Sequence, residues 1–450
     1  MVGYSKYKYS GFSWIGDIPE HWDIKRTKYV AKLYNGDSLN DEQKNAYSDF
    51  SESDETIPYI ASKDIDKDSC SVDYLNGTRI PKKEKNTSGR PFSKAPAGSS
   101  LLCIEGGSAG KKRCILDREV NFVNKLCCFV PKINGKFMFY YICSNSYWEN
   151  FKQNLQGMIG GVTVTKLGTF PIPIPTDSEQ KAISDYLDAE CKKIDNLIAK
   201  EERRVKLIEE TKLSIITKVI TKGLTASASM KDSGVPWVGK VPSSWKRHRI
   251  KYDLIRSAAG VWGEEEKGND DDIVCYRIAD YDYSKGILDN DNPTVRNIPA
   301  KDRQGRLLKN GDLLIEKSGG GDIWPVGRVV RYNYDIEAVS SNFIHSITVD
   351  ERKIDKDFLY YYFRFLYANK VNLLYFNQTT GIQNLKVSAY LSQSLYAPEL
   401  SEQREIVEYL NKECGAYDAT IDKANQQIDL LKEYKQSLIT EVVTGKRKVC

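Results

Sequence analysis

The apolar positions after residue 178 recur with the spacing of a long α-helix. Nine apolar residues between Ile183 and Val219 share one face over ten turns, which is a period of 3.6 residues. Ser178 offers a hydroxyl that is suited to cap the first N–H groups, and Gly223 is suited to end the helix. At about 1.5 Å per residue, the pattern predicts a helix on the order of 65 Å long.

A second stripe of the same kind runs from Ile406 to Val442. Because pairing would bury both apolar faces at once, we expect an antiparallel pair in which the first helix connects two globular regions and the second returns beside it. The alternative is that each helix packs only on its own globular domain. The predicted helix-pair interface consists of Ile183, Leu187, Ile194, Ile198, Val205 and Ile208 in the first helix and Ile406, Leu410, Tyr417, Ile421, Ile428 and Leu431 in the second.

The two stripes belong to an internal repeat. The segment SGFSWIGDIPEHWDIKRTKY, residues 10–29, returns as SGVPWVGKVPSSWKRHRIKY, residues 233–252, with nine of twenty positions identical at an offset of 223. At the same offset, 19 of the 45 residues in 178–222 are identical to those in 401–445. A period this long excludes a solenoid and predicts two copies of a domain-plus-helix unit. We expect Trp14, Pro19 and Trp22 of the leader segment to pack each unit's start onto its domain or helix.

The regions between the repeated ends have diverged. Their short apolar stretches, such as LLCI, CCFVP and FIHSITV, are bounded by Gly, Asn and Asp and are typical of β-strands. GSSLLCIEGG in the first half resembles GDLLIEKSGG in the second when Leu101 and Leu102 are aligned with Leu313 and Leu314. Each globular region is therefore predicted to be mixed α/β with a strand-rich half.

Composition narrows the class of protein. The 450 residues are enough for roughly three structural units, and 40% hydrophobic and 28% charged residues are typical of a folded, water-soluble chain. We expect a cytoplasmic protein, because no apolar run of about 18 residues and no signal peptide is present. Ten cysteines without a CxxC pair and only three histidines predict reduced thiols and no metal site.

Catalytic motifs are missing. The chain lacks the aromatic-ended Asn/Asp-Pro-Pro motif of amino-methyltransferases, and GGSAGKK at 106–112 has the wrong spacing for a phosphate-binding P-loop. We therefore predict no catalytic residues. Two basic, glycine-rich loops are better suited to approach phosphates, although solvated surface turns are the alternative explanation. Their candidate residues are Lys111, Lys112 and Arg113 in the first half and Lys317 and Arg328 in the second.

The paired leader SGxxWxGxxPxxW, the segments PIPIPTDSEQ and APELSEQ, and the long helix after each SEQ resemble the DNA specificity subunit of type I restriction–modification systems. The resemblance covers the whole chain. It implies two target-recognition domains, each recognising half of a split, asymmetric DNA site, and antiparallel helices related by a pseudo-twofold repeat that fix the spacer. It further implies a noncatalytic subunit that docks two methyltransferase subunits and is joined by restriction/translocase subunits. No cofactor is expected in this chain, with S-adenosylmethionine, ATP and magnesium on partner subunits.

The resemblance also divides the chain and adds candidate DNA contacts. It implies a first recognition domain at 1–177, a spacer helix at 178–224, a second recognition domain at 225–400 and a second helix at 401–450. The stretches YIASKDID and YRIADYD resemble the family's early strand and loop, and the turns at 157–166 and 379–388 precede the last strand of each domain. Gln and Arg are suited to bidentate contacts with adenine and guanine. These segments contribute the candidates Ser62, Lys63, Arg277, Thr163, Lys166, Gln383 and Lys386.

Two other classes of function stay open. One is a single-chain nuclease or methyltransferase with duplicated DNA-reading domains, which would cleave or methylate DNA without partners. The other is a coiled-coil scaffold with protein ligands only, which would show no preference for any DNA sequence.

Overall fold

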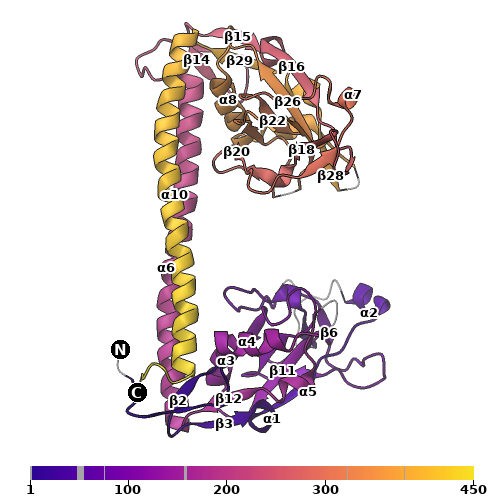
Figure 1. The fold of residues 1–450 in the computed structure, drawn as a ribbon, viewed down its shortest axis with the longest axis vertical. Coiled ribbons are helices and arrows are strands. Elements are labelled where there is room, and N and C mark those ends of the chain that lie inside the picture. The colour runs from indigo at the N-terminus through magenta and orange to yellow at the C-terminus, as the bar shows by residue number, and fades with distance from the viewer. Residues whose placement is uncertain are drawn as a thin grey trace. The chain divides into compact units, whose positions relative to one another are not determined.

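The computed structural model describes residues 3–47, 55–75, 77–156, 160–321, 323–379 and 381–449. It consists of two compact units (Figure 1). The N-terminal unit contains residues 1–201 and 426–450, and the C-terminal unit contains residues 202–425. Each unit therefore combines one strand-rich domain with half of each long helix. Among the described helices, none has a stretch long and apolar enough to cross a membrane.

The N-terminal domain is built on a four-stranded sheet of order β4-β11-β8-β9, beside a second sheet of order β6-β5-β10-β7. Two-stranded ladders β1-β2 and β12-β3 attach the leader segment and the last strand. The elements are β1 (Tyr7–Tyr9), β2 (Asp17–Pro19), β3 (Asp23–Arg26), α1 (Thr27–Val30), β4 (Ala31–Asn35), α2 (Asp41–Ala46), β5 (Thr56–Ile60), the 3-10 helix η1 (Ser62–Asp64), β6 (Arg79–Pro81), β7 (Lys94–Ala95), β8 (Ser100–Cys103), β9 (Arg113–Ile115), β10 (Val120–Phe122), β11 (Leu126–Pro131), α3 (Gly135–Cys143), α4 (Asn145–Gln153), α5 (Val164–Leu167) and β12 (Pro171–Ile174).

The C-terminal domain has a six-stranded sheet of order β16-β26-β22-β24-β20-β19, with smaller sheets of order β17-β21-β18-β25 and β23-β28-β27 and the ladders β13-β14 and β15-β29. The elements are β13 (Met230–Asp232), β14 (Lys240–Pro242), β15 (Lys246–Arg249), η2 (Ile250–Asp253), β16 (Leu254–Ala259), β17 (Glu264–Glu265), β18 (Asp272–Tyr276), η3 (Ile278–Asp280), β19 (Tyr281–Asp282), β20 (Ile287–Leu288), β21 (Val295–Asn297), α7 (Ala300–Arg303), β22 (Leu313–Glu316), β23 (Ser318–Gly319), β24 (Val329–Arg331), β25 (Ala338–Ser340), β26 (Ile344–Val349), α8 (Lys356–Ala368), η4 (Val371–Tyr375), β27 (Phe376–Thr379), β28 (Ile382–Leu385), α9 (Val387–Tyr390) and β29 (Ser394–Ala397).

The long helices are α6 (Asp177–Lys222) and α10 (Leu400–Val443), which lie side by side within each unit (Figure 1). In the N-terminal unit, Lys435 of α10 bonds Asp195 of α6 at 2.7 Å. In the C-terminal unit, Lys212 of α6 bonds Asp418 of α10. Between these two ion pairs α6 advances by 17 residues while α10 retreats by 17, so the helices are antiparallel in one register. The two pairs are also equivalent at the repeat offset of 223.

The apolar stripes contact more than the facing helix. In the N-terminal unit the stripe of α6 shares one core with Phe137 of α3 and with the C-terminal part of α10, and the C-terminal unit repeats this arrangement with α8. Both packing hypotheses therefore describe part of the contact. The predicted interface residues that are buried are Ile183, Leu187, Ile194, Ile198, Ile406, Leu410, Ile421 and Ile428, whereas Val205, Ile208, Tyr417 and Leu431 are half-buried.

The start of α6 corrects one sequence prediction. The helix begins at Asp177, and the hydroxyl of Thr176 accepts the backbone N–H of Glu179 at 3.3 Å, while the Glu179 carboxylate accepts the N–H of Thr176 at 3.1 Å. This reciprocal capping box places Ser178 inside the first turn, where it is not the cap. At the other end Gly223 follows the helix with a φ of +71°, as expected for a glycine that ends a helix.

The leader segments pack as predicted, and the repeat extends to individual hydrogen bonds. Trp22 is fully buried and its indole N–H donates to Glu179 at 3.3 Å, while Trp245 donates to Glu402 at 3.2 Å. The side-chain oxygen of Gln180 accepts the N–H of Asn134, and its amide donates to the Pro175 carbonyl. The second half repeats both bonds, with Gln403 contacting Asp355 and Pro398.

The sheets correct the alignment of the two halves by one residue. Leu102 lies in the core that contains the helices, whereas Leu101 faces the opposite side of the sheet. In the second half Leu313 and Ile315 face the helices, and Leu314 faces away. Leu101 therefore corresponds to Leu314 and not to Leu313. A one-residue shift moves every side chain of a strand to the other face, and a short apolar run does not reveal which face is which.

Candidate nucleic-acid interface

In the N-terminal domain the basic glycine-rich loop lies against the segment that precedes α5. The N–H of Gly106 donates to the carbonyl of Gly160 at 3.0 Å, and Glu105 forms a bridge with Gly161. These contacts bring together two stretches that are about 55 residues apart in sequence, and both contain predicted DNA contacts. Residues 157–159 of the predicted turn lie outside the described residues.

The early loop, which contains η1, also contacts the glycine-rich loop of the N-terminal domain. The Lys112 ammonium donates to the carbonyl of Ser62 at 2.7 Å, which fixes η1 beside the glycine-rich loop. Lys63 and Lys111 are exposed, and so are Thr163 and Lys166. The Thr163 hydroxyl accepts the N–H of Lys166 at 3.3 Å and so caps α5. Three predicted segments thus converge within one unit and present cations and a hydroxyl to solvent.

The C-terminal domain brings the equivalent segments together through a small sheet. In the sheet β23-β28-β27, Ser318 pairs with Asn384 and Gly319 pairs with Gln383. The glycine-rich loop is thereby joined to the hairpin that precedes α9. Lys386 is exposed at the end of this hairpin, and Lys317 is half-buried. Thr380, within the predicted turn, lies outside the described residues.

Three predicted contact residues face the interior of their domains. The Arg113 guanidinium donates to the carbonyls of Gly110 and Cys143. Arg328 donates two N–H groups to Glu316, at 2.8 and 3.1 Å, and stacks 3.6 Å above the Tyr283 ring. The side chain of Gln383 is 3% exposed, and its oxygen accepts the N–H of Val326.

The burial of these groups gives them a structural role. Burial raises the pKa of the Glu316 carboxyl, and the neighbouring Arg328 acts in the opposite direction because it stabilises the charged form. A guanidinium held by a buried carboxylate is not free to contact a base, so Arg328 supports its loop rather than extends from it. The carbonyl bonds of Arg113 and the burial of Gln383 give these side chains the same role. Arg277 is intermediate, since it bonds Asp280 at 2.9 Å while its side chain is 42% exposed.

Two exposed residues beside the second glycine-rich loop were not predicted from the sequence. Ile323 and Trp324 follow the second glycine-rich loop, and they are 82% and 61% exposed. The only signal in the sequence was an apolar pair between glycines and a proline, which a buried strand would show as well. An exposed aromatic ring beside basic residues is suited to stack on a base.

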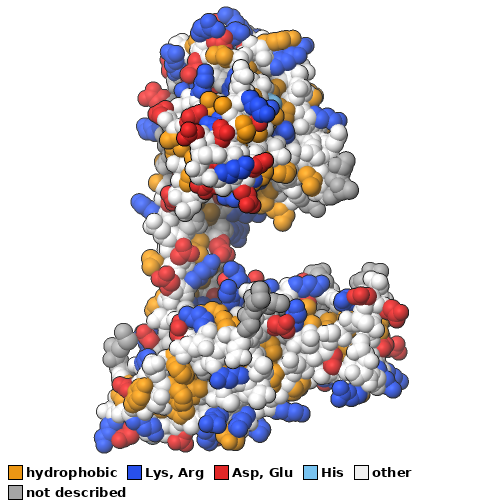
Figure 2. Space-filling view, turned by 45° about the vertical axis from the view of Figure 1, so that its right-hand side comes forward, with side chains coloured by type: hydrophobic (Ala, Val, Ile, Leu, Met, Phe, Trp, Pro, Cys, Tyr) orange, Lys and Arg blue, Asp and Glu red, His pale blue; other side chains and the backbone are white. Residues whose placement is uncertain are grey.

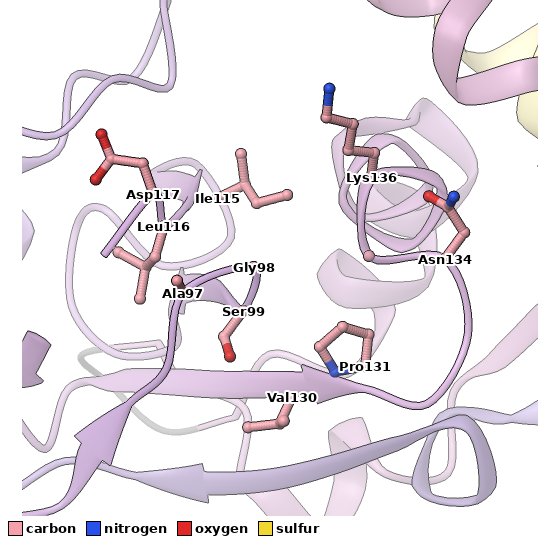
Figure 3. Close-up of a pocket in the computed structure, with 11 residues that line it drawn as sticks. Ala97, Gly98, Ser99, Ile115, Leu116, Asp117, Val130, Pro131, Asn134 and Lys136 are labelled. Atoms are coloured by element: carbon pink, nitrogen blue, oxygen red, sulfur yellow. The ribbon is translucent and has the colours of Figure 1, made fainter. Parts of the chain in front are cut away.

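The surface carries charges of both signs, and the N-terminal domain has an open hollow. Lys and Arg side chains are spread over the visible face of each unit and alternate with carboxylates (Figure 2). A hollow of about 600 Å³ lies in the N-terminal domain between the ends of β8 and β9 and the start of α3 (Figure 3). Two of its polar side chains are engaged, because Asn134 caps α3 and Lys136 bonds Asp188. Within the described ranges, no group of three or more His, Cys, Asp or Glu is placed to hold a metal ion.

Comparison with known proteins assigns the chain to a family. The type I restriction modification DNA specificity domain matches residues 19–209 and 265–433. The chain belongs to this family. The predicted identification as a specificity subunit of a type I restriction–modification system is confirmed, as is the mixed α/β fold with two strand-rich domains and long antiparallel helices. The chain is accordingly a DNA specificity component rather than a catalytic subunit.

The similar proteins match along nearly the whole chain. The type I restriction enzyme StySPI specificity subunit of Salmonella potsdam is 22% identical over 96% of this chain and 90% of its own. The MjaVIII specificity subunit of Methanocaldococcus jannaschii is 24% identical over 96% of this chain and 94% of its own. A solved chain from work on complex assembly and conformational transition of the type I R-M system has a TM-score of 0.65 at 14% identity, over 95% of this chain and 98% of that one.

Proposed function

We propose that this specificity subunit recognises a bipartite, asymmetric DNA site, one half with each strand-rich domain. The observation that carries the proposal is that a glycine-rich loop and a late turn lie together in each domain, with the early loop beside them in the N-terminal domain. Because the frame repeats while these loops differ in sequence, the two half-sites are expected to differ. Arg113, Arg328 and Gln383 are left out because their side chains are engaged inside their domains. The proposed contacts are the other candidates: Ser62, Lys63, Lys111, Lys112, Thr163, Lys166, Arg277, Lys317 and Lys386.

The paired helices are proposed to set the length of the unread spacer between the half-sites. The antiparallel pairing of the helices in each unit, with one ion pair and an apolar contact, supports this role. An insertion of seven residues, about two helical turns, keeps the apolar stripe in phase. It lengthens a helix by about 10 Å, which corresponds to about three base pairs of duplex DNA.

The test inserts seven residues into both helices at paired positions, between Glu201 and Glu202 of α6 and between Ile428 and Asp429 of α10. The assembled complex is then expressed, and methylated sites are mapped by long-read sequencing. We expect unchanged half-sites separated by a spacer about three base pairs longer. The same insertion at Gly268, in an exposed turn, is the control. An unchanged spacer, or altered half-sites, would contradict the proposal.

The helices are also proposed to dock two methyltransferase subunits, with restriction/translocase subunits joining that core. Leu207 and Leu430 are equivalent at the repeat offset, and they are 53% and 65% exposed on α6 and α10. Large exposed apolar side chains that recur in both halves are suited to bind two copies of one partner. We expect Leu207→Asp or Leu430→Asp alone to lose one methyltransferase subunit and the double variant to lose both, as measured by the mass of the purified complex.

A further inference from the structure

Both halves retain an exposed tyrosine that the fold does not need. Tyr29 and Tyr252 are equivalent at the offset of 223, and they are 62% and 61% exposed. In each half the preceding lysine lies over the ring, with Lys28 at 5.1 Å and Lys251 at 4.9 Å from the ring centroid. Exposed rings contribute little to a core, so the retention of this pair at the end of the repeated leader segment points to a shared ligand.

In the N-terminal domain the tyrosine borders a basic hollow of about 610 Å³. Three cations line it, namely Lys25, Arg26 and Lys132, and no carboxylate does. In the described part of the chain, neither these cations nor Lys28 makes an ion pair, and all four are exposed. We name Lys25, Arg26, Lys28, Tyr29 and Lys132 the N-terminal basic patch.

The C-terminal domain keeps part of this arrangement. Arg249 and Lys251 occupy the places of Arg26 and Lys28, and within the described residues neither is ion-paired. Asp350 takes the place of Lys132, because its N–H donates to the carbonyl of Asp253 as that of Lys132 donates to Val30. Lys353 lies three residues further on, 3.8 Å from the Asp350 carboxylate, and its ammonium donates to the carbonyl of Tyr252 at 2.7 Å. We name Arg249, Lys251, Tyr252 and Lys353 the C-terminal basic patch.

Each patch adjoins the segment that presents a proposed base contact. The N–H of Lys28 donates to the carbonyl of Gly168 at 3.0 Å, two residues after Lys166. The N–H of Lys251 donates to the carbonyl of Leu391 at 2.8 Å, five residues after Lys386. A strand of DNA whose bases meet the late turn would therefore pass its neighbouring phosphates over the patch.

We propose that the two basic patches bind the phosphate backbone of duplex DNA, independently of sequence, beside each half-site. Ammonium, guanidinium and phenol groups all donate hydrogen bonds to phosphate oxygens, and such contacts position a protein on the duplex without selecting bases. A surface for another protein is less well matched, because lysine is depleted in protein–protein interfaces. The proposal rests on the DNA-binding function proposed above.

The test uses the complex assembled with its methyltransferase subunits and the double variant Lys28→Gln, Lys251→Gln. Dissociation constants are measured for a duplex that contains the recognised site and for a scrambled duplex, between about 50 and 200 mM salt. Each lost phosphate contact lowers the slope of log K against log salt by about 0.9, so we expect a decrease of about two. Affinity for both duplexes should fall about tenfold, and their ratio should not change.

The matched control is Lys44→Gln with Lys267→Gln, which removes the same charge from lysines already paired with Asp41 and Glu264. It should leave the slope unchanged. A double variant with the wild-type slope would overturn the proposal, and so would loss of methyltransferase subunits, which would make the patches a protein-docking surface. Failure of the wild-type complex to prefer any site would instead refute the proposed function, and it would be seen without any variant.

Discussion

The two strand-rich domains share a set of equivalent hydrogen bonds, which we call the frame, but the side chains around these bonds differ. Tyr141 donates to the carbonyl of Pro171, and Tyr362 donates to that of Ser394, both at 2.8 Å. Beside this common frame, strand register places Arg331 of the C-terminal domain where the N-terminal domain has Ile115. The duplicated chain therefore kept the bonds that hold α3 and α8 to the last strand of each domain, and the side chains around them were free to change.

The hollow of Figure 3 illustrates the difference. In the N-terminal domain Ile115 and Lys136 border an open space of about 600 Å³. In the C-terminal domain Arg331 bonds Asp357, the counterpart of Lys136, at 3.0 Å and lies 4.4 Å from the centre of the Tyr360 ring. A cation, an acid and a ring fill the second site, whereas the first is open. Equivalent backbones thus do not imply equivalent cavities.

Replacement of a leader tryptophan should have the largest effect on stability. A comparison of the two replacements tests whether the leader contributes equally to the stability of both halves. Trp22 and Trp245 are 0% and 1% exposed. Replacement of either by alanine should lower the free energy of unfolding of its own unit by about 3 to 5 kcal/mol, because a large buried side chain is lost. Chemical denaturation followed in each variant measures this cost.

The chain supplies a control for this comparison. Trp324 is 61% exposed, so Trp324→Ala should change stability by no more than about 0.5 kcal/mol. If Trp22→Ala and Trp245→Ala differed by more than about 2 kcal/mol, the frame would not be energetically equivalent in the two halves.

The two equivalent ion pairs between the long helices should differ in their contribution to stability. Lys212 and Asp418 have side chains that are 7% and 24% exposed, against 19% and 49% for Lys435 and Asp195. Asp418→Asn leaves a buried ammonium unpaired and should cost about 2 to 3 kcal/mol. Asp195→Asn should cost less than about 1 kcal/mol, because water replaces the lost partner.

Urea denaturation of the two variants measures the difference, and a third pair provides the reference. Lys285 and Asp422 lie 3.4 Å apart, with side chains about half exposed. Asp422→Asn should therefore change stability little. Equal losses for Asp418→Asn and Asp195→Asn would mean that burial does not determine the strength of these pairs.

The sequence predicted the repeat, the long helices and the leader packing because each depends on a local pattern. The period of 3.6 and the identities at offset 223 need no knowledge of the tertiary structure. The sequence did not predict that Arg328 bonds Glu316 or that Gln383 is buried, because the partners become neighbours only when β22, β24 and β28 assemble. The sequence did not predict the exposure of Tyr29 either, because aromatic residues are more often buried than exposed.

The smallest predicted effect is a pH step that only the C-terminal domain should show. Burial, together with the charges of Lys317 and Arg256, lowers the pKa of His345 to about 4. The equivalent strand position in the N-terminal domain is Cys127, which has no imidazole. Between pH 6.5 and 4 the unfolded chain binds a proton at His345 that the folded domain does not, so stability is lost as the pH falls through this range.

Because His345 is partly exposed, this loss should be discounted to about 1 to 2 kcal/mol. Urea denaturation of the chain at pH 7 and pH 4.5 measures it, and His345→Asn should abolish the part that belongs to this side chain. His21→Asn, in the N-terminal unit, should leave the pH dependence of the C-terminal domain intact. If His345→Asn retained the full step, other groups would account for it, and the two domains would not be distinguished by this histidine.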